Sequence, residues 1–367
     1  MKMTNTLLAG IRILDLSRLL PGPFCTLYFA QLGAEVIKIE EPHGGDYNRA
    51  LSPDMFDLIN RGKKSITLDL RKADDVAAFH ALVKDADVVL ESFRPGVMDK
   101  LGCGYDTLKK INPKLVFAAL TGYGQTGPYR DRAGHDMNYL GYAGVLDQIG
   151  SAGGPPVQSN VQIADLAGGA LTCAIGILAA IIGARESGQG CFVDVGMHDG
   201  SLALQVLSFS ALRTLGRSQP RGQDMLSGAL PNYSFYECAD GKFMAVGALE
   251  PKFWANLTAA LGLPDLARKP MAPGKLSDPI RAEVAAIFKT KTRDEWEKIL
   301  LAHDACTTAI LTLEEALNDP QVVARGLVEQ VKGKPAPAMP IQFPGVTMPV
   351  CADAPKLGAN NAEILKR

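Results

Sequence analysis

The chain has 367 residues, of which 47% are hydrophobic and 21% are charged, and its formal net charge is -1. At about 150 residues per domain, this length predicts two domains, and it is sufficient to bury a sizeable core. The near-neutral charge gives no support for a nucleic-acid or membrane-surface partner. Any anionic ligand must therefore be held by a local basic cluster.

The cysteines and the chain ends indicate the cellular compartment. Seven cysteines stand singly, without C-x-x-C spacing, which argues against a zinc site or a disulfide framework and for a reducing compartment. The first ten residues lack the apolar stretch of a signal peptide, and the final Leu-Lys-Arg is no peroxisomal tail. The most apolar run, residues 171–183, predicts a buried helix too short to span a bilayer. We expect a cytoplasmic protein.

The first 125 residues alternate strand and helix patterns. Strands are expected at residues 11–16, 34–39, 65–70, 87–93 and 115–121. Helices are expected at residues 25–32, 73–85 and 96–101. This alternation predicts an α/β fold with a doubly wound, Rossmann-like parallel sheet. The turn after the first strand reads SRLLPGPFC and lacks the G-x-G-x-x-G of a dinucleotide site, so nicotinamide binding is rejected.

The second half of the chain has different patterns. A long helix is expected at residues 165–185, and a linker at residues 220–228. Two short apolar runs flank an Asp-Gly turn at residues 240–241, which predicts a hairpin, and three helices follow. We expect a large domain over residues 1–220, completed by residues 331–367, and a smaller α+β domain over residues 221–330.

Two side chains are candidates for chemistry. His135 stands in a Gly-His-Asp-Met-Asn-Tyr segment after a glycine-rich loop, where the carboxyl end of a predicted strand would place a ligand. Asp165 stands where the long apolar helix begins. It is either an N-cap or a carboxylate in a glycine-lined pocket. The five histidines include no H-x-x-x-H pair, so no metal site is expected.

Basic residues occur beside two of the predicted strands. Residues 61–64 read RGKK before one strand, and Arg94 follows another in ESFRPG. Such residues at neighbouring strand ends are suited to phosphate groups, although each is also compatible with a solvated surface charge.

Several segments, in chain order, resemble the class III coenzyme A-transferase superfamily and, within it, the α-methylacyl-CoA racemases. They include LAGIRILDLSRLLPGPFCTLYFAQLGAEVIKIE, NRGKKSITLDL, ESFRPGVMDKLG, AGHDMNYL, IADLAGG and YECADGKFMAVGALEPKFW. The resemblance covers nearly the whole chain. GHDMNY together with IADLAGG is the part typical of the racemases.

The resemblance implies roles for particular residues. His135 and Asp165 would be the two catalytic acid/bases, and Glu237 a carboxylate that bonds the histidine. The residues that would contact coenzyme A or the rest of the substrate are Lys63, Thr67, Leu68, Asp69, Leu70, Arg94, Gly134, Asp136, Met137, Asn138 and Tyr139. Many relatives have an arginine where this chain has Glu41, so Lys63 is expected to supply that charge or affinity is weaker.

The resemblance also implies an activity and an assembly. The activity is racemisation of a 2-methylacyl-CoA, in which the α-proton leaves one face and returns to the other through an enolate. No cofactor is needed, since coenzyme A is part of the substrate. The assembly is a homodimer of interlocked, ring-like subunits. The alternatives are a coenzyme A-transferase with Asp165 as nucleophile and a non-catalytic coenzyme A-binding protein.

Two parts of the mechanism concern the start of the Asp165 helix: the donors to the enolate oxygen and the pKa of Asp165. The enolate oxygen needs donors, and the backbone N–H groups at the start of the Asp165 helix are the expected ones. A helix N-terminus lowers the pKa of an aspartate, whereas burial raises it. The residues alone do not decide which effect is larger for Asp165.

Overall fold

The computed structural model describes residues 6–366, except for the side chain of Lys275, and it divides into two compact units. Unit 1 comprises the chain up to Val145, Ser159–Gln205, and Arg325 onwards. Unit 2 comprises Leu146–Gln158 and Val206–Ala324. Both units are therefore discontinuous, and residues 146–158 and 206–220, expected in the large domain, belong to unit 2.

Unit 1 contains a six-stranded, wholly parallel sheet in the order β3-β2-β1-β4-β5-β6. Its strands are β1 (Arg12–Asp15), β2 (Glu35–Glu40), β3 (Lys64–Thr67), β4 (Val88–Glu91), β5 (Val116–Thr121) and β6 (Phe192–Gly196). The strand order reverses between β1 and β4, which is the arrangement of a doubly wound fold. The predicted α/β class is confirmed.

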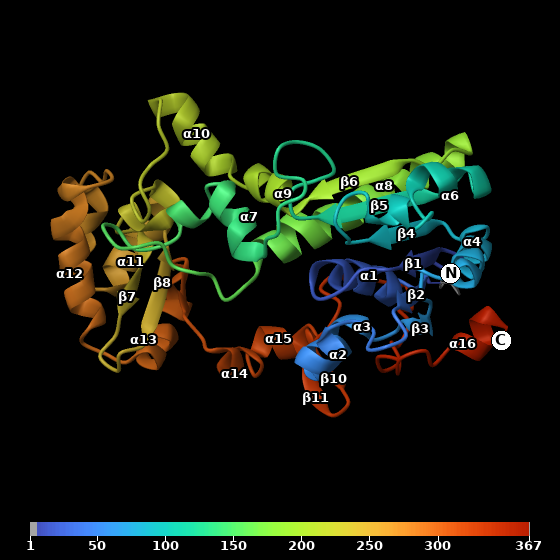
Figure 1. Ribbon diagram of the computed structural model, residues 1–367. Helices are drawn as coiled ribbons and strands as arrows, with labels where there is room; N and C mark the ends of the chain where they lie inside the picture. The colour runs from blue at the N-terminus through green and yellow to red at the C-terminus, as the bar shows by residue number, and fades with distance from the viewer. Residues whose placement is uncertain (1–5, 367) are drawn as a thin grey trace. The chain divides into compact units, whose positions relative to one another are not determined.

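Helices cover both faces of this sheet (Figure 1). They are α1 (Pro21–Gln31), α2 (Asn48–Leu51), α3 (Pro53–Asn60), α4 (Ala73–Val83), α5 (Val97–Lys100), α6 (Tyr105–Ile111), α7 (Asp136–Tyr142), the π-helix η2 (Ala164–Leu171), α8 (Thr172–Ser187), α9 (Met197–Ala203) and α16 (Asn361–Leu365). A hairpin of β10 (Val328–Val331) and β11 (Lys334–Pro337) completes the unit.

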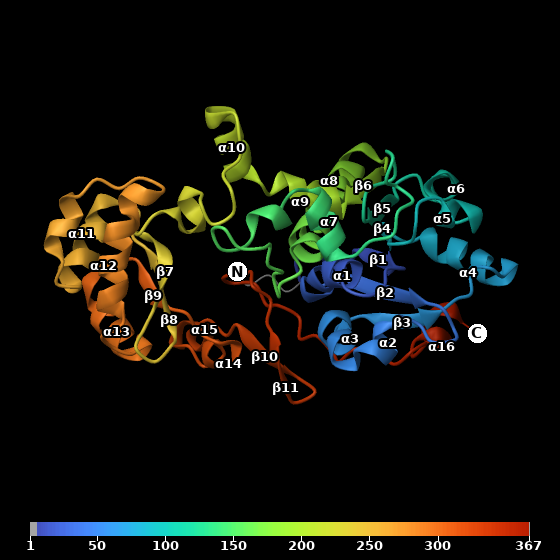
Figure 2. The ribbon, with the colours of Figure 1, turned by 60° about the vertical axis from the view of Figure 1, so that its left-hand side comes forward.

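The core of unit 1 follows from strands that are buried on both faces. Leu14 and Ile37 pair in register and pack in one apolar cluster with Phe79 of α4 and Leu108 of α6. Near-continuous apolar strands are expected where helices cover both faces of a parallel sheet. Helix α16 contacts β3, and Asn360 and Asn361 accept hydrogen bonds from the N–H groups of Ser65 and Thr67 (Figure 2). The C-terminal segment therefore completes the sheet layer that the N-terminal segment begins.

The first helix begins four residues earlier than the sequence pattern suggests. Helix α1 starts at Pro21, inside the segment interpreted as a turn. Proline is tolerated in the first turn of a helix because those N–H groups have no partner within the helix. The prolines that resembled a loop are therefore the start of the helix.

The apolar helix expected at residues 165–185 is longer and more exposed than predicted. Together η2 and α8 run over Ala164–Ser187, which is long and apolar enough to cross a membrane by length and composition. The expectation of a span too short for that is wrong. Only 39% of its most apolar window is buried, and Ile175 and Ile182 are 70% and 62% exposed. Core helices of soluble proteins pass the same test.

Unit 2 is built on a three-stranded antiparallel sheet of β7 (Tyr233–Glu237), β8 (Phe243–Gly247) and β9 (Thr307–Ala309). The predicted hairpin is confirmed as β7 and β8. The helices are α10 (Val206–Leu215), α11 (Pro251–Ala260), α12 (Asp278–Phe288), α13 (Arg293–Leu300), α14 (Leu313–Ala316) and α15 (Pro320–Ala324). Shorter turns are η1 (Leu146–Gln148), η3 (Met225–Ala229), η4 (Pro264–Arg268), η5 (Lys275–Ser277) and η6 (Leu301–His303).

Three aromatic rings pack together in the core of unit 2. The ring of Phe288 lies 5.1 Å from that of Tyr236 and 5.4 Å from that of Trp296. All three side chains are buried, so β7, α12 and α13 share one apolar centre. The predicted linker at residues 220–228 is partly helical, because η3 begins at Met225.

Candidate active site

His135 stands at the start of α7, as its N-cap, with an exposed side chain. Its backbone N–H donates to Oδ1 of Asn138 at 3.0 Å, which fixes the loop that enters the helix. Tyr139 of the same helix packs on Gly122, the residue after β5, where an added Cβ would lie 2.4 Å from the ring. Helix α7 therefore lies at the carboxyl end of the sheet, where α/β folds bind ligands.

Packing explains why a glycine, Gly134, stands before His135. A Cβ on Gly134 would lie 2.7 Å from the ring of Tyr139, and the Tyr139 hydroxyl donates to the Gly134 carbonyl. Gly134 therefore allows the Tyr139 ring to lie close to the backbone. Burial, the main cause, and the charge of Asp165 both raise the pKa of Tyr139.

Asp165 lies in the first turn of η2, in unit 1 like His135. Burial raises the pKa of Asp165 to about 7, and the neighbouring charge of Asp136 adds to this effect. Both causes favour the protonated form of Asp165. Near neutral pH, Asp165 can both give and take a proton.

The glycines after Asp165 allow two helices to pack closely. A Cβ on Gly168 would lie 2.8 Å from the backbone nitrogen of Ser201, and one on Gly200 would lie 1.9 Å from the Gly168 carbonyl oxygen. The IADLAGG segment thus packs its backbone against α9. A π-helical turn at this place is also notable, since such turns are often found at functional sites.

Asp136, interpreted as a substrate contact, binds the Asp165 segment instead. Its Oδ1 accepts the backbone N–H groups of Ala164 at 2.7 Å and Asp165 at 3.0 Å. The N–H of Leu166 donates to Gln162. These three N–H groups have partners within the protein, so their role as donors to the enolate oxygen stays a prediction. Met137 is 48% exposed.

A second buried aspartate of unit 1 lies in a different environment. The Asp15 carboxylate lies 3.2 Å from Nζ of Lys63 and accepts hydrogen bonds from Ser17 and Thr26. Burial opposes ionisation, but Lys63, Lys38 and these hydrogen bonds together lower the pKa of Asp15 to about 2. This carboxylate is a stable buried anion.

Lys63 has no proton left for a phosphate in this state. Its Nζ donates to Asp15, to the Pro23 carbonyl at 2.9 Å and to Asn60 Oδ1 at 3.0 Å, and an ammonium has three protons. Burial, the largest cause, lowers the pKa of Lys63 to about 8. The structure therefore gives Lys63 an internal partner, and its contact with coenzyme A stays a prediction.

The other basic residues of RGKK are also engaged. Arg61 is buried and bonds Glu329 at 2.8 Å and the Pro337 carbonyl at 2.7 Å. Lys64 bonds Glu35 and Glu363. These residues join the sheet to the C-terminal segment, so the basic run mainly stabilises the fold.

Arg94 is the basic candidate that stays available. It is exposed, and over residues 6–366 no ion pair or hydrogen bond of its guanidinium is found. Arg18, on the loop after β1, lies 5.1 Å above the Phe93 ring and 5.4 Å from the Tyr47 ring. Two arginines thus lie at the reversal of strand order between β1 and β4, where open sheets bind ligands.

The segment from Thr67 to Leu70 follows β3. Thr67 is bonded to Asn361 through its N–H and its hydroxyl, and Leu68 is buried. Asp69 is nearly buried and accepts from Nε of Arg71 at 2.7 Å. Arg71 itself is 69% exposed and lies 3.8 Å from Glu41. Arg71 was not selected from the sequence, although it is the exposed cation beside Glu41.

Glu237 has a partner on the surface of unit 2. Its carboxylate lies 2.6 Å from Nζ of Lys289, and both side chains are about half exposed, at 44% and 50%. Exposed ion pairs of this kind contribute little. Glu237 and His135 belong to different units, so the proposed bond between them stays a prediction.

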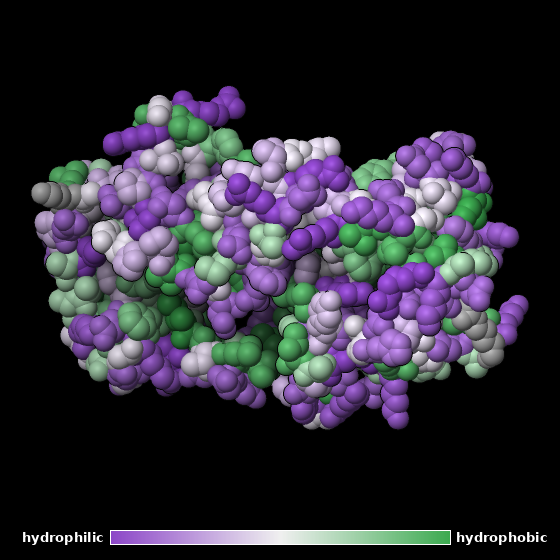
Figure 3. Space-filling model, in the orientation of Figure 1, coloured by the Kyte–Doolittle hydropathy of each residue, from purple (hydrophilic) through white to green (hydrophobic). Residues whose placement is uncertain are grey.

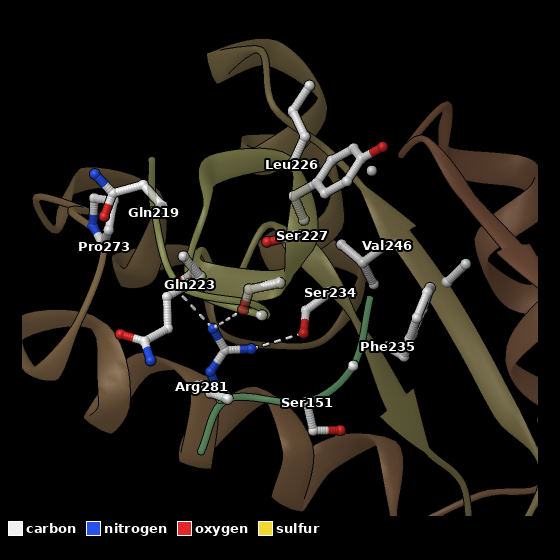
Figure 4. Close-up of a pocket in the computed structure, with 18 of the residues that line it drawn as sticks. Ser151, Gln219, Gln223, Leu226, Ser227, Ser234, Phe235, Val246, Pro273 and Arg281 are labelled. Atoms are coloured by element: carbon white, nitrogen blue, oxygen red, sulfur yellow. Dashed lines mark hydrogen bonds between the residues drawn. The ribbon is translucent and has the colours of Figure 1, made fainter. Parts of the chain in front are cut away.

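Unit 2 contains a cavity of about 1230 Å³. Apolar residues such as Val157, Leu226 and Phe235 line it together with polar ones. Arg281 of α12 bonds Ser234 and the carbonyls of residues 228 and 229, which fixes the wall made by η3 (Figure 4). A wall of mixed apolar and polar groups suits an amphiphilic ligand. The segment interpreted as a linker therefore forms part of a cavity.

No group of three or more metal-binding side chains occurs among residues 6–366. The carboxyl edge of the parallel sheet in unit 1 therefore carries a histidine, an aspartate with a raised pKa and the exposed Arg94. Such a set is suited to proton transfer on an anionic ligand.

This chain belongs to CoA-transferase family III, whose family model matches residues 8–361. Among its relatives is the human protein named alpha-methylacyl-CoA racemase, which is 37% identical over 98% of this chain and 92% of its own length. The mouse protein of that name is 38% identical, with the same coverage. The predicted family is confirmed.

Relatives named as transferases match as well. The succinate--glutarate CoA-transferase of Agrobacterium fabrum is 34% identical over 98% of this chain and 94% of its own length. Among solved structures, a CAIB/BAIF family protein from Brucella suis superposes with a TM-score of 0.86 at 31% identity, over 98% of this chain and 99% of that chain. The fold and the family are thus shared by both activities.

Proposed function

We propose that this protein racemises 2-methylacyl-CoA thioesters, with His135 and Asp165 as the two acid/bases. The observation that carries this proposal is the raised pKa of Asp165, about 7, beside the histidine segment. A general acid/base works best when its pKa lies near the working pH. The full-length similarity to racemases supports the same activity.

The electrostatics of Asp165 suit a general acid/base. A transferase would use Asp165 as a nucleophile, and a carboxyl group attacks only when it is ionised. Burial and the Asp136 charge both disfavour the ionised form. With a pKa of about 7, Asp165 has both its protonated and its ionised form near neutral pH, as a reaction with two acid/bases requires.

In the proposed reaction, neutral His135 removes the α-proton and the electron pair moves onto the thioester oxygen. Protonated Asp165 then delivers a proton to the opposite face of the α-carbon. In the reverse direction the two residues exchange roles. Arg94 is proposed to hold a phosphate of coenzyme A, because it is exposed and its guanidinium is not otherwise used.

We also propose a homodimer, in a reducing compartment such as the cytoplasm. Apolar side chains of α8 and α10 are exposed, including Ile175, Ile182 and Val206, the last at 73%. Large exposed apolar patches commonly mark protein–protein contacts. Green hydrophobic patches also lie among the hydrophilic residues of the face in Figure 3. The free cysteines agree with reducing conditions. Sedimentation at nanomolar concentration tests the dimer, and a native monomer would contradict it.

The test of the activity uses one enantiomer of a 2-methylacyl-CoA in heavy water. A racemase incorporates deuterium at the α-carbon and forms the other enantiomer without any added acid. A transferase moves coenzyme A to an added free carboxylic acid and leaves the α-proton in place. Acceptor-dependent transfer without α-proton exchange would therefore replace this proposal with the transferase alternative.

A further inference from the structure

One carboxylate connects the two segments that carry the proposed acid/bases. Asp136 follows His135 directly in the chain, and its Oδ1 accepts the N–H groups of Ala164 and Asp165 at 2.7 and 3.0 Å. These bonds join residues that are 28 and 29 positions apart. The distance between His135 and Asp165 is thus restrained by a single side chain.

The position of His135 depends on such a contact. Helix α7 has only seven residues, and helices this short are marginal by themselves. Tyr139 fixes the helix against the end of β5, and Asp136 fixes it against η2. A shift of about 1 Å between two catalytic groups can cost about a hundredfold in rate.

The same carboxylate is also a charge. Burial is the larger cause of the raised pKa of Asp165, and Asp136 is the charge that adds to it. The charge of Asp165 in turn contributes to the raised pKa of Tyr139. The elements packed against η2 carry further titratable groups. They are Cys25, Tyr28, Tyr142, Cys173, Arg185, Glu186, Asp194, His198 and Asp199.

We propose that Asp136 is a positioning residue that holds Asp165 at a fixed place relative to His135 and keeps a proton on it. The proposal rests on the proposed function. In the direction written above, Asp165 then acts as the acid and His135 as the base. After turnover the proton taken from carbon is on His135 and the proton given to carbon has left Asp165. The Asp136 charge then favours return of a proton to Asp165.

Two substitutions separate the two roles. Asp136→Asn keeps an oxygen that can accept both N–H groups but removes the charge, whereas Asp136→Ala removes both. Asp131→Asn is the matched control, because Asp131 is an exposed carboxylate of the same loop that lies 3.5 Å from Arg130. Circular dichroism and a thermal melt of each variant report folding.

The first readout is the titration of Asp165 without substrate. Carbon-13 carboxyl resonances are followed against pH, and the Asp165 signal is identified by its loss in Asp165→Asn. We expect its midpoint to fall by about one pH unit in Asp136→Asn and to be unchanged in Asp131→Asn. An unchanged midpoint in Asp136→Asn would overturn the charge role.

The second readout is the pH dependence of α-proton exchange for each enantiomer. In Asp136→Asn the limb governed by Asp165 should move to lower pH with a nearly unchanged KM. In Asp136→Ala, kcat should fall by about a hundredfold, and full kcat would overturn the positioning role. If the unmodified enzyme exchanges no α-proton while the titration still shifts, the proposed function fails and the coupling of Asp136 to Asp165 stands.

Discussion

Two aspartates of unit 1, Asp15 which is buried and Asp165 which is partly buried, have opposite properties. Asp15 lies between lysines and hydroxyls, and its pKa is lowered to about 2. Asp165 lies next to another carboxylate, and its pKa is raised to about 7. Burial raises the pKa of both, so the sign of the neighbouring charge decides the outcome. One aspartate is thereby a structural anion, and the other a group that titrates where an enzyme works.

The largest effect is expected from removing the titrating aspartate. Asp165→Asn should lower the rate of inversion by about 10²–10⁴-fold, the usual contribution of a general acid/base. The measurement is inversion of one enantiomer by chiral chromatography. Asp199→Asn is a control, since Asp199 is an exposed carboxylate bonded to His198. Full inversion by Asp165→Asn would contradict the two-base account.

Asp165→Asn should change the stability of the fold in the opposite direction from Asp15→Asn. The folded pKa of Asp165 is above its unfolded value of 3.8. Its contribution to stability is therefore complete below about pH 4 and is lost as pH rises through about 7. Asp165→Asn should consequently stabilise the fold at pH 8, by roughly 1–3 kcal/mol. Urea unfolding at pH 5 and 8 measures this, and equal differences at the two pH values would contradict it.

Asp15→Asn should destabilise the fold, because it leaves Lys63 buried without its anion. Breaking a buried pair costs about 3–5 kcal/mol, measured by urea unfolding at pH 7. The folded pKa of Asp15 is below its unfolded value, so this contribution is present above about pH 4 and lost as pH falls towards 2. Asp106→Asn, at an exposed pair with Lys109, should change stability by less than about 1 kcal/mol. Similar losses of stability in Asp15→Asn and Asp106→Asn would contradict the expected difference between a buried and an exposed ion pair.

The basic residues extend the comparison from aspartates to cations. Arg94→Ala should weaken the binding of coenzyme A by roughly 1–3 kcal/mol, measured by titration calorimetry, and should leave stability unchanged. Arg268→Ala, at an exposed arginine of unit 2, is the control. An unchanged dissociation constant for Arg94→Ala would remove Arg94 from the site.

The smallest effect is expected at Glu237. Its carboxylate is paired with Lys289 at the surface, so Glu237→Gln should change stability by less than about 1 kcal/mol. The pH profile of exchange is the informative readout. A fall in kcat, together with a shift of the part of the pH profile that His135 governs, would support the predicted role of Glu237 as a carboxylate that bonds His135.

The alternation of elements and the family were predictable from the sequence, because strand and helix periodicity is local and the motifs occur in order. The run RGKK was not interpretable in the same way. Its arginine and lysines are bound by Glu329, Asp15 and Glu363, which are distant in the chain. The role of Asp136 was missed for the same reason, since its partners lie 28 and 29 residues away.

Deuterium incorporation into each enantiomer, measured separately for His135→Ala and Asp165→Ala, tests the central claim most directly. If each residue serves one face, each variant should exchange the α-proton of one enantiomer and should not convert it to the other. The two variants should differ in which enantiomer they exchange. Full racemisation by the Asp165→Ala enzyme, or loss of exchange from the same enantiomer in both variants, would contradict the two-base account.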